Sequence, residues 1–223
     1  MLQVRDLRKS YRDGDRQIHV LQGLNMQLAA GQCIAIMGPS GCGKSTLISC
    51  LAGLSRSDQG SILFSGEELT HLPADQLTQN RAANIGVIFQ QFHLIPHLTA
   101  LENVRLPLDF RNISHTEAHQ KAKHALQLVG LDARADHFPN QLSRGECQRV
   151  AIARVLVTSP KLVLADEPTA SLDRQTGREI IKLLIELSRR QKAGLVIVTH
   201  DQEMAAACDQ RYHFTEGQLR SAP

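Results

Sequence analysis

The stretch that decides the fold is Gly38-Pro39-Ser40-Gly41-Cys42-Gly43-Lys44-Ser45-Thr46, which fits the pattern G-x-x-x-x-G-K-[ST]. An apolar run over residues 33–37 precedes it and an apolar helical pattern over residues 47–52 follows it. This strand–loop–helix context is the one that a phosphate-binding P-loop requires, and a chance glycine turn does not explain it. Backbone N–H groups of such a loop cradle phosphate oxygens, and the helix N-terminus adds partial positive charge. We expect Lys44 to reach the β- and γ-phosphates and the Ser45 hydroxyl to bind Mg²⁺.

Size and composition favour a globular protein that does not bind nucleic acid. The chain has 223 residues, of which 42% are hydrophobic, and its net charge is only +3. It has no Trp, and its five cysteines form no C-x-x-C pair, which fits the reducing cytoplasm better than a disulfide framework. No secretion signal and no apolar run of about 20 residues is present, so any role at a membrane requires a partner.

Apolar strands that alternate with helical patterns predict an α/β fold with a mostly parallel sheet. Two capping boxes, Ser114 with Glu117 and Ser143 with Glu146, predict helix starts, and Gly130 predicts a helix end. A turn is expected at residues 13–15, and an amphipathic helix at residues 178–190. Strands are expected at residues 2–7, 24–28, 33–37, 61–64, 85–89, 162–165 and 195–198.

The helical middle of the chain is expected to be inserted into the sheet. We predict one domain over residues 1–223, in which residues 1–90 and 158–223 form the α/β core and residues 91–157 form a helical subdomain.

Two carboxylates follow the apolar strand at residues 162–165. Asp166 and Glu167 would lie at the carboxyl end of a core strand, beside the P-loop. There, Asp166 can anchor Mg²⁺ and Glu167 can accept a proton from an attacking water. A lone Asp-Glu pair is more often a solvated turn, but the P-loop favours the catalytic interpretation.

Polar residues also follow two other strands. His200 comes after the strand at residues 195–198 and could contact a γ-phosphate, although an unpaired histidine is often structural. Gln90 comes after the strand at residues 85–89, where its amide oxygen could bind Mg²⁺ or hold a water. Gln90 also leads into the helical part, which makes it a candidate switch.

Ser143 has two compatible interpretations. It can be an ordinary helix cap, and the outward N–H groups behind it can bind an anion from another molecule. His115, His119 and His124 could suggest a metal, but a solvated helix is favoured because no constellation of cysteines or acids accompanies them.

The ordered set of motifs resembles the nucleotide-binding subunit of ABC transporters over essentially the whole chain. The motifs are the P-loop, Gln90, Leu142-Ser143-Arg144-Gly145-Glu146, Asp166-Glu167, Ser171-Leu172-Asp173 and His200. The resemblance implies a RecA-like P-loop NTPase core with an antiparallel β part at the N-terminus. It also implies a head-to-tail homodimer in which each ATP lies between the P-loop of one copy and the Ser143 helix of the other.

Site roles follow from the same resemblance. Tyr11 matches the aromatic residue that stacks on adenine, Asp166 the Walker B acid and Glu167 the general base. Asp173 matches a residue of the loop that signals across the dimer. His200 matches the histidine that acts as the γ-phosphate switch. The expected catalytic residues are Lys44, Glu167 and His200, and the expected Mg²⁺ ligands are Ser45, Gln90 and Asp166. The expected ATP contacts are Tyr11, Gly38, Pro39, Ser40, Gly41, Cys42, Gly43, Lys44, Ser45, Thr46, Gln90, Ser143, Gly145, Glu146 and Asp173.

Finer features are similar to the ATPases of lipoprotein-releasing, macrolide-exporting and heterocyst-glycolipid-exporting systems. They lie at residues 98–104 and 164–169. One departure is that Arg144 replaces the first glycine of the usual Leu-Ser-Gly-Gly-Gln, which bears on hydrolysis rate rather than on ATP binding. Glu146, which replaces the glutamine, suits the capping box.

The resemblance implies an ATPase that powers an integral membrane permease subunit from the cytoplasmic face. Residues 92–104 would meet that subunit, or else pack between the subdomains. A regulatory ATPase that signals to a membrane partner without transport, as in cell division, has the same motifs. A kinase or GTPase is disfavoured because no N-K-x-D motif is present and the Ser143 segment has no role in such enzymes.

Overall fold

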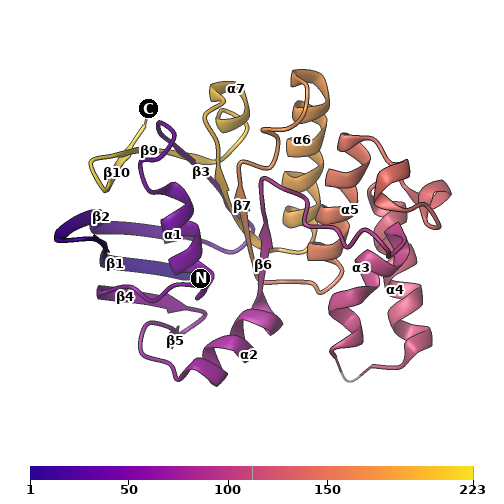
Figure 1. The fold of residues 1–223 in the computed structure, drawn as a ribbon, viewed down its shortest axis with the longest axis horizontal. Helices are drawn as coiled ribbons and strands as arrows, with labels where there is room; N and C mark the ends of the chain where they lie inside the picture. The colour runs from indigo at the N-terminus through magenta and orange to yellow at the C-terminus, as the bar shows by residue number, and fades with distance from the viewer. Residues whose placement is uncertain (112, 223) are drawn as a thin grey trace.

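Two β-sheets form the frame of the molecule in the computed structural model, which describes residues 1–111 and 113–222 (Figure 1). The larger sheet has six strands in the order β10-β9-β3-β8-β7-β6. Strands β9, β3, β8, β7 and β6 run parallel, and β10 pairs antiparallel with β9. Their bounds are β3 Cys33–Met37, β6 Ile85–Ile88, β7 Leu162–Asp166, β8 Gly194–Val198, β9 Gln210–Thr215 and β10 Gln218–Ser221. The predicted α/β class with a mostly parallel sheet is confirmed.

The central strands are apolar along their whole length because both faces of the sheet are covered. All residues of β3 and β8 are buried, as are Leu162–Ala165 of β7. Side chains alternate between the faces, so Val163 and Ala165 enter one apolar cluster whereas Leu162 and Leu164 enter another. The short apolar runs in the sequence are therefore core strands rather than pieces of helix.

The smaller sheet is antiparallel and contains the N-terminus. Its order is β2-β1-β4-β5, with bounds β1 Leu2–Asp13, β2 Arg16–Leu28, β4 Gln59–Phe64 and β5 Glu67–Glu68. Asp13 pairs with Arg16, and Gly14 between them has φ +59°, which confirms the predicted turn. The strands expected at residues 2–7 and 24–28 are present, but β1 continues to Asp13 and β2 starts at Arg16. The extension of β1 is mainly polar, whereas that of β2 contains the apolar residues Ile18, Val20 and Leu21, so a strand signal at residues 18–21 was missed.

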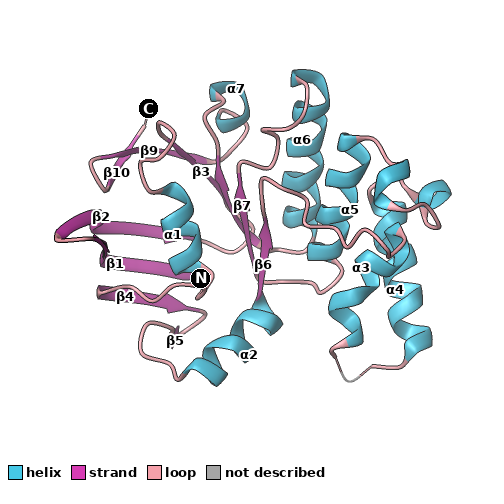
Figure 2. Cartoon of the chain, in the orientation of Figure 1, coloured by secondary structure: helices cyan, strands magenta, loops and turns pink. Residues whose placement is uncertain are grey.

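Helices cover both faces of the larger sheet, and α3, α4 and α5 gather on the side of β6 (Figure 2). Their bounds are α1 Lys44–Leu51, α2 Ala74–Asn84, α3 Ala100–Asp109, α4 His115–Leu128, α5 Arg144–Leu156, α6 Arg174–Arg190 and α7 Gln202–Ala205, with 3₁₀ turns at Asp132–Arg134 and Pro139–Gln141. Gly130 follows the end of α4 with φ +73°, as its position at a helix end predicted. No helix within the described ranges has the length and apolar composition needed to cross a membrane.

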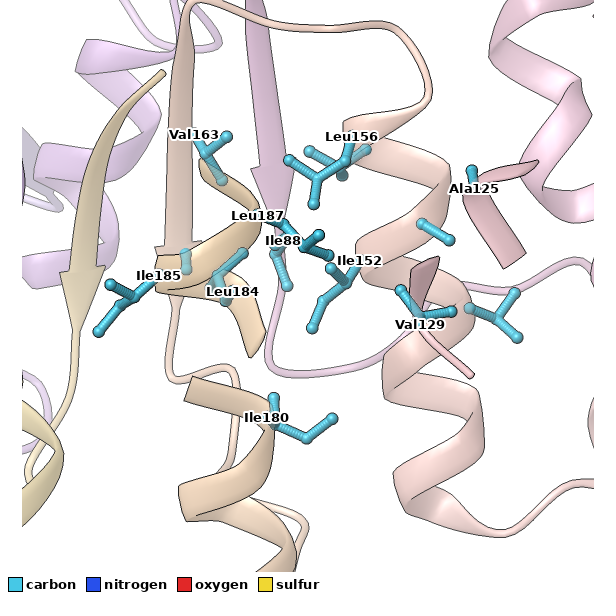
Figure 3. Packing of buried hydrophobic residues seen from close by; sticks show 14 of the residues in the cluster. Ile88, Ala125, Val129, Ile152, Leu156, Val163, Ile180, Leu184, Ile185 and Leu187 are labelled. Atoms are coloured by element: carbon cyan, nitrogen blue, oxygen red, sulfur yellow. The ribbon is translucent and has the colours of Figure 1, made fainter. Parts of the chain in front are cut away.

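Two large apolar clusters lie on opposite faces of the larger sheet. The α5-side core contains Ile88, Val163 and Leu195 from strands, together with apolar residues of α3–α6 (Figure 3). The α1-side core contains Ile36, Leu164 and Val198 from the larger sheet, together with Leu47 and Ile48 of α1. Buried apolar residues of β1, β2 and β4 complete it. Ile180, Ile181, Leu184 and Leu187 of α6 are buried in the α5-side core, at the spacing that the amphipathic pattern predicted.

Several local expectations need correction. Helix α6 begins at Arg174, not near Arg178, because the Asp173 side chain accepts a hydrogen bond from the Thr176 N–H and caps an earlier turn. Ser114 accepts from the Glu117 N–H, but the reciprocal half of that capping box is not formed, because the Glu117 carboxylate pairs with Lys121 instead. Helices α2 and α7 and strands β9 and β10 were not predicted, because their residues are largely polar or exposed.

Candidate functional site

The carboxyl ends of four parallel strands place the predicted residues along one edge of the larger sheet. Ile36 of β3 pairs with Val198 of β8, and Val198 pairs with Asp166 of β7. Ile88 of β6 pairs with Ala165, one residue before Asp166. Since adjacent strands lie about 4.8 Å apart, the P-loop, His200, the acid pair and Gln90 follow one another along this edge.

The P-loop depends on glycine at two positions for steric reasons. Gly43 has φ +112°, and a Cβ there would lie 2.4 Å from Cγ1 of Val20. A Cβ on Gly38 would lie 2.8 Å from the carbonyl oxygen of Phe214. The backbone therefore runs close against strands β2 and β9. Helix α1 starts directly after Gly43 with no side-chain cap, which leaves its first N–H groups for an anion.

Lys44 is buried, and its ammonium contacts two carbonyl oxygens and, at 3.9 Å, the sulfur of Cys42. Its side chain is 6% exposed, and Nζ donates to the carbonyl oxygens of Gly38 and Pro39, both at 2.8 Å. Among the described residues no carboxylate forms a salt bridge with it. A buried charge without a counter-ion favours an anionic ligand, so Lys44 is prepared to bind phosphate.

Glu167 and His200 contact each other across the ends of β7 and β8. Nδ1 of His200 lies 2.9 Å from Oε2 of Glu167, and the Glu167 N–H donates to the carbonyl of Val198 at 3.0 Å. Glu167 has φ +47°, a left-handed conformation that is uncommon for a residue other than glycine. Backbone strain of this kind concentrates at functional sites. The sequence placed each residue at a strand end, but only the adjacency of β7 and β8 brings the two together.

The capping box at the start of α5 is complete. The Ser143 hydroxyl accepts from the Glu146 N–H at 3.2 Å, and the Glu146 carboxylate accepts from the Ser143 N–H at 2.8 Å. The backbone bond from Ser143 is the main reason why the pKa of Glu146 lies below its usual range, and the hydroxyl of Ser143 and Arg134 contribute further. The N–H groups of Arg144 and Gly145 have no acceptor within residues 1–111 and 113–222. This helix end is therefore an ordinary cap that also leaves two N–H groups open.

The P-loop helix and the Ser143 helix pack on opposite faces of the larger sheet. Helix α1 contributes to the α1-side core, whereas α5 contributes to the α5-side core (Figure 1). Asp173 caps α6 next to the Ser143 end, since a Cβ on Gly145 would lie 2.8 Å from Cγ2 of Thr176. Arg144, the departure from the usual motif, donates to the carbonyl of Ser171 at 3.4 Å, so it points toward the α6 side of this end.

Tyr11 lies on the β1–β2 hairpin, near the P-loop. It is 43% exposed and pairs with Ile18, two residues before the Val20 that contacts Gly43. Nζ of Lys9 lies 5.3 Å from the centre of its ring, so one face of Tyr11 is already occupied by a cation.

Gln90 is exposed, and the segment after it is held by a residue that the sequence did not single out. Arg154 of α5 donates from Nη1 to the carbonyl of His93 at 2.6 Å and from Nη2 to that of Phe92 at 2.7 Å. Burial lowers the pKa of Arg154. No sequence signal identified it, because its partners are backbone carbonyls about sixty residues away.

The donors for Mg²⁺ are suitable in type. A hydroxyl, a carboxylate and an amide oxygen come from Ser45, Asp166 and Gln90, and Mg²⁺ prefers oxygen ligands completed by water and phosphate. Over the described part of the chain, no three His, Cys, Asp or Glu side chains gather to hold a metal by themselves. His115, His119 and His124 are exposed on α4. Nε2 of His115 lies 3.0 Å from Nη1 of Arg105.

Comparisons with known proteins agree on one family. The model for "ABC transporter" matches residues 21–170. The lipoprotein-releasing system ATP-binding protein LolD of Alcanivorax borkumensis is 42% identical over 220 residues, covering 99% of this chain and 96% of LolD. The macrolide export ATP-binding/permease protein MacB of Shigella flexneri is 39% identical and covers 100% of this chain, which spans 34% of MacB.

A solved structure shows the same fold. The ATP-binding cassette MJ0796, determined as a dimer in a post-hydrolysis state with ADP and Pi, has a TM-score of 0.91 and 39% identity, with coverage of 100% of this chain and 98% of that chain.

Proposed function

Because this chain belongs to the ABC transporter family and is an ATPase subunit of that kind, we propose that it closes as a head-to-tail homodimer on two ATP molecules and thereby drives an integral membrane subunit. The observation that carries the proposal is the separation of two half-sites. The P-loop edge offers a buried cation and open N–H groups, and the α5 end offers a second set of open N–H groups on the other face of the sheet. One ATP can use both sets when they come from two copies.

The proposed role of each residue rests on the family resemblance, and the position of the residue in the structure supports it. Lys44 and the P-loop N–H groups bind the phosphates and stabilise the negative charge that develops during hydrolysis. Glu167 takes the proton of the attacking water, and His200 orients the Glu167 carboxylate through their 2.9 Å contact. Ser45, Asp166 and Gln90 would hold Mg²⁺, which supplies charge neutralisation of the phosphates. Ser143, Gly145 and the rest of the capped α5 end bind the γ-phosphate from the partner copy, with Asp173 beside them, and Tyr11 stacks on adenine.

The membrane partner is proposed to contact the surface around Gln90, from Phe89 into the segment that follows. Phe89 is 38% exposed and packs its ring edge-to-face against His93, with ring centres 5.2 Å apart. Ala100 and Val104 are instead fully buried in the α5-side core, so only the first part of the 92–104 segment is available for docking. In this proposal the protein acts at the cytoplasmic face of the membrane, beside a permease of the lipoprotein-releasing or macrolide-exporting type, and the similarity to LolD and MacB supports it.

Glu167→Gln tests the catalytic assignment. The variant keeps the size of the side chain but cannot accept the proton, so we expect ATP binding and a stable closed dimer with turnover lowered by about 10²–10⁴-fold. Size-exclusion chromatography with Mg-ATP measures the dimer, and phosphate release measures turnover. Glu186→Gln is the matched control. Glu186 lies on the exposed face of α6, so this variant should hydrolyse ATP at the wild-type rate. A Glu167→Gln variant that turns over ATP at the wild-type rate contradicts the assignment.

A transport assay separates the two uses of this ATPase. The protein is purified together with its membrane subunit and placed in vesicles. ATP-dependent movement of a substrate supports transport, whereas ATP-dependent activation of the partner without movement supports regulation.

A further inference from the structure

Two cysteines lie in contact at a place remote from the P-loop and the other predicted site residues. Sγ of Cys33, the first residue of β3, lies 2.9 Å from Sγ of Cys208, which precedes β9. A disulfide bond needs the sulfurs at about 2.05 Å, so a movement of about 1 Å brings them to bonding distance. Both residues lie at the amino ends of parallel strands, at the edge opposite the P-loop.

The backbone on both sides of this cysteine pair is fixed. The Cys33 N–H donates to Oδ2 of Asp209 at 2.7 Å, and the Asp209 N–H donates to the carbonyl of Cys33 at 2.9 Å. The other oxygen of Asp209 pairs with Arg189 at 2.6 Å. These bonds already hold Cys208 next to Cys33 in the folded chain. A disulfide between them would therefore require little further ordering of the backbone.

The two thiols differ in accessibility. Cys33 is 1% exposed, whereas Cys208 is partly exposed. The hydrogen bond to Cys208, followed by burial, raises the pKa of the Cys33 thiol well above its usual range. Because Cys208 is the more exposed of the two, an oxidant from solvent meets Cys208 first.

We propose that Cys33 and Cys208 form a reversible disulfide on exposure to peroxide, and that this bond is a redox-dependent staple of the fold. Hydrogen peroxide oxidises the Cys208 thiol to a sulfenic acid and is itself reduced to water. The Cys33 sulfur then attacks the sulfenic sulfur, its proton leaves with the hydroxyl as a second water, and the S–S bond forms. Two electrons pass from the two sulfurs to one peroxide, and a dithiol reductant reverses the change.

The Cys33–Cys208 disulfide should raise the stability of the fold and leave ATP turnover nearly unchanged. It joins residues that are 175 positions apart, and cross-links that close long loops restrict the unfolded chain most. The bond lies at the opposite end of β3 from the P-loop, so ATP turnover should stay within about twofold. The proposal is independent of the dimer mechanism and of the membrane partner.

The test compares reduced protein with protein treated with equimolar hydrogen peroxide. We expect the intact mass to fall by two hydrogens and a non-reducing peptide map to join Cys33 to Cys208. The midpoint of thermal unfolding should rise by about 5–15 °C and return to the reduced value with dithiothreitol. The peptide map is needed because Cys42 is also partly exposed and can consume peroxide without a partner.

Variants make the outcome decisive. Cys208→Ser changes the more exposed member and should abolish both the mass change and the thermal shift. Cys50→Ser is the matched control, since Cys50 is as buried as Cys33 but lies outside the pair, and it should keep both effects. Oxidation of Cys208 to sulfinic acid without a link to Cys33, a link between two chains, or a link without a thermal shift would each overturn the proposal.

Discussion

Glu146 shows at the residue scale how one side chain serves both stability and the site. Its carboxylate closes the capping box on Ser143 and also pairs with Arg134 at 3.1 Å. The same contacts leave the N–H groups of Arg144 and Gly145 directed away from the helix. The cap thus satisfies two donors of α5 and leaves two for a ligand.

The charge of Glu146 predicts a pH-dependent stability. Its pKa is lower in the folded chain than the unfolded value of about 4.3, so its stabilisation is present above that pH and is lost as the pH falls through the folded pKa. Glu146→Gln should therefore lower the free energy of unfolding by about 1 kcal/mol at pH 7. Urea unfolding should show this difference shrinking below about pH 4. Glu216→Gln, at the exposed β9–β10 turn, is the control, and a difference for Glu146→Gln that stays constant with pH contradicts this account.

Helix α5 is the element that joins two parts of the site. Its N-terminus carries Ser143, and three turns later Arg154 holds the segment after Gln90 through two carbonyls. A 13-residue helix is a rod of about 20 Å, so a shift of that segment moves the Ser143 end with it. In the proposed dimer, this connection would link the candidate switch at Gln90 to the nucleotide bound by the partner copy.

Arg154→Met tests this connection. The variant removes two charge-assisted hydrogen bonds and leaves two carbonyls without their donors, so the free energy of unfolding should fall by about 2–4 kcal/mol. Hydrogen exchange should increase selectively in residues 91–98. Arg190→Met is the matched control, because Arg190 pairs with Glu186 on the exposed face of α6 and should cost under about 1 kcal/mol. Equal losses in the two variants, or exchange unchanged in residues 91–98, would show that Arg154 does not hold the segment.

At the scale of the whole molecule, the helices that begin at the two proposed half-sites, α1 and α5, pack on opposite faces of the sheet. Neither half-site is sufficient for hydrolysis in the proposed mechanism, so activity belongs to a pair of chains. The exposed positions of Gln90, Ser143 and His200 fit surfaces that are to be covered by a ligand or a second copy.

A mixing experiment tests this arrangement. Lys44→Ala removes the phosphate cation, and Ser143→Asp keeps a good helix cap while its negative charge repels phosphate. Each homodimer should be inactive, but a mixed dimer has one intact site, so an equal mixture should recover about a quarter of wild-type hydrolysis if the sites act independently. Ser114→Asp, the same substitution at the N-cap of α4 outside the proposed site, is the control and should keep most of the activity. A mixture no more active than its two components argues against shared sites.

Some predictions could be made from the sequence because their causes are local. The P-loop, the Ser143 capping box and the Gly130 helix end each depend on residues within a few positions of one another. Apolar runs such as residues 162–165 and 195–198 predicted buried strands, since burial on both faces leaves no room for polar side chains. These signals were enough to place Asp166, Glu167 and His200 at strand ends.

By itself, then, the sequence determined the α/β class, the phosphate-binding loop and the polar residues that end each core strand. Only the tertiary structure decided the order β3-β8-β7-β6, and with it the contact between Glu167 and His200. It also decided the hydrogen bonds from Arg154 to the carbonyls of Phe92 and His93, and the contact between the sulfurs of Cys33 and Cys208. The physical reason is distance along the chain: turns and caps are fixed by neighbouring residues, whereas strand order and these contacts depend on pairing between segments that lie far apart in the sequence.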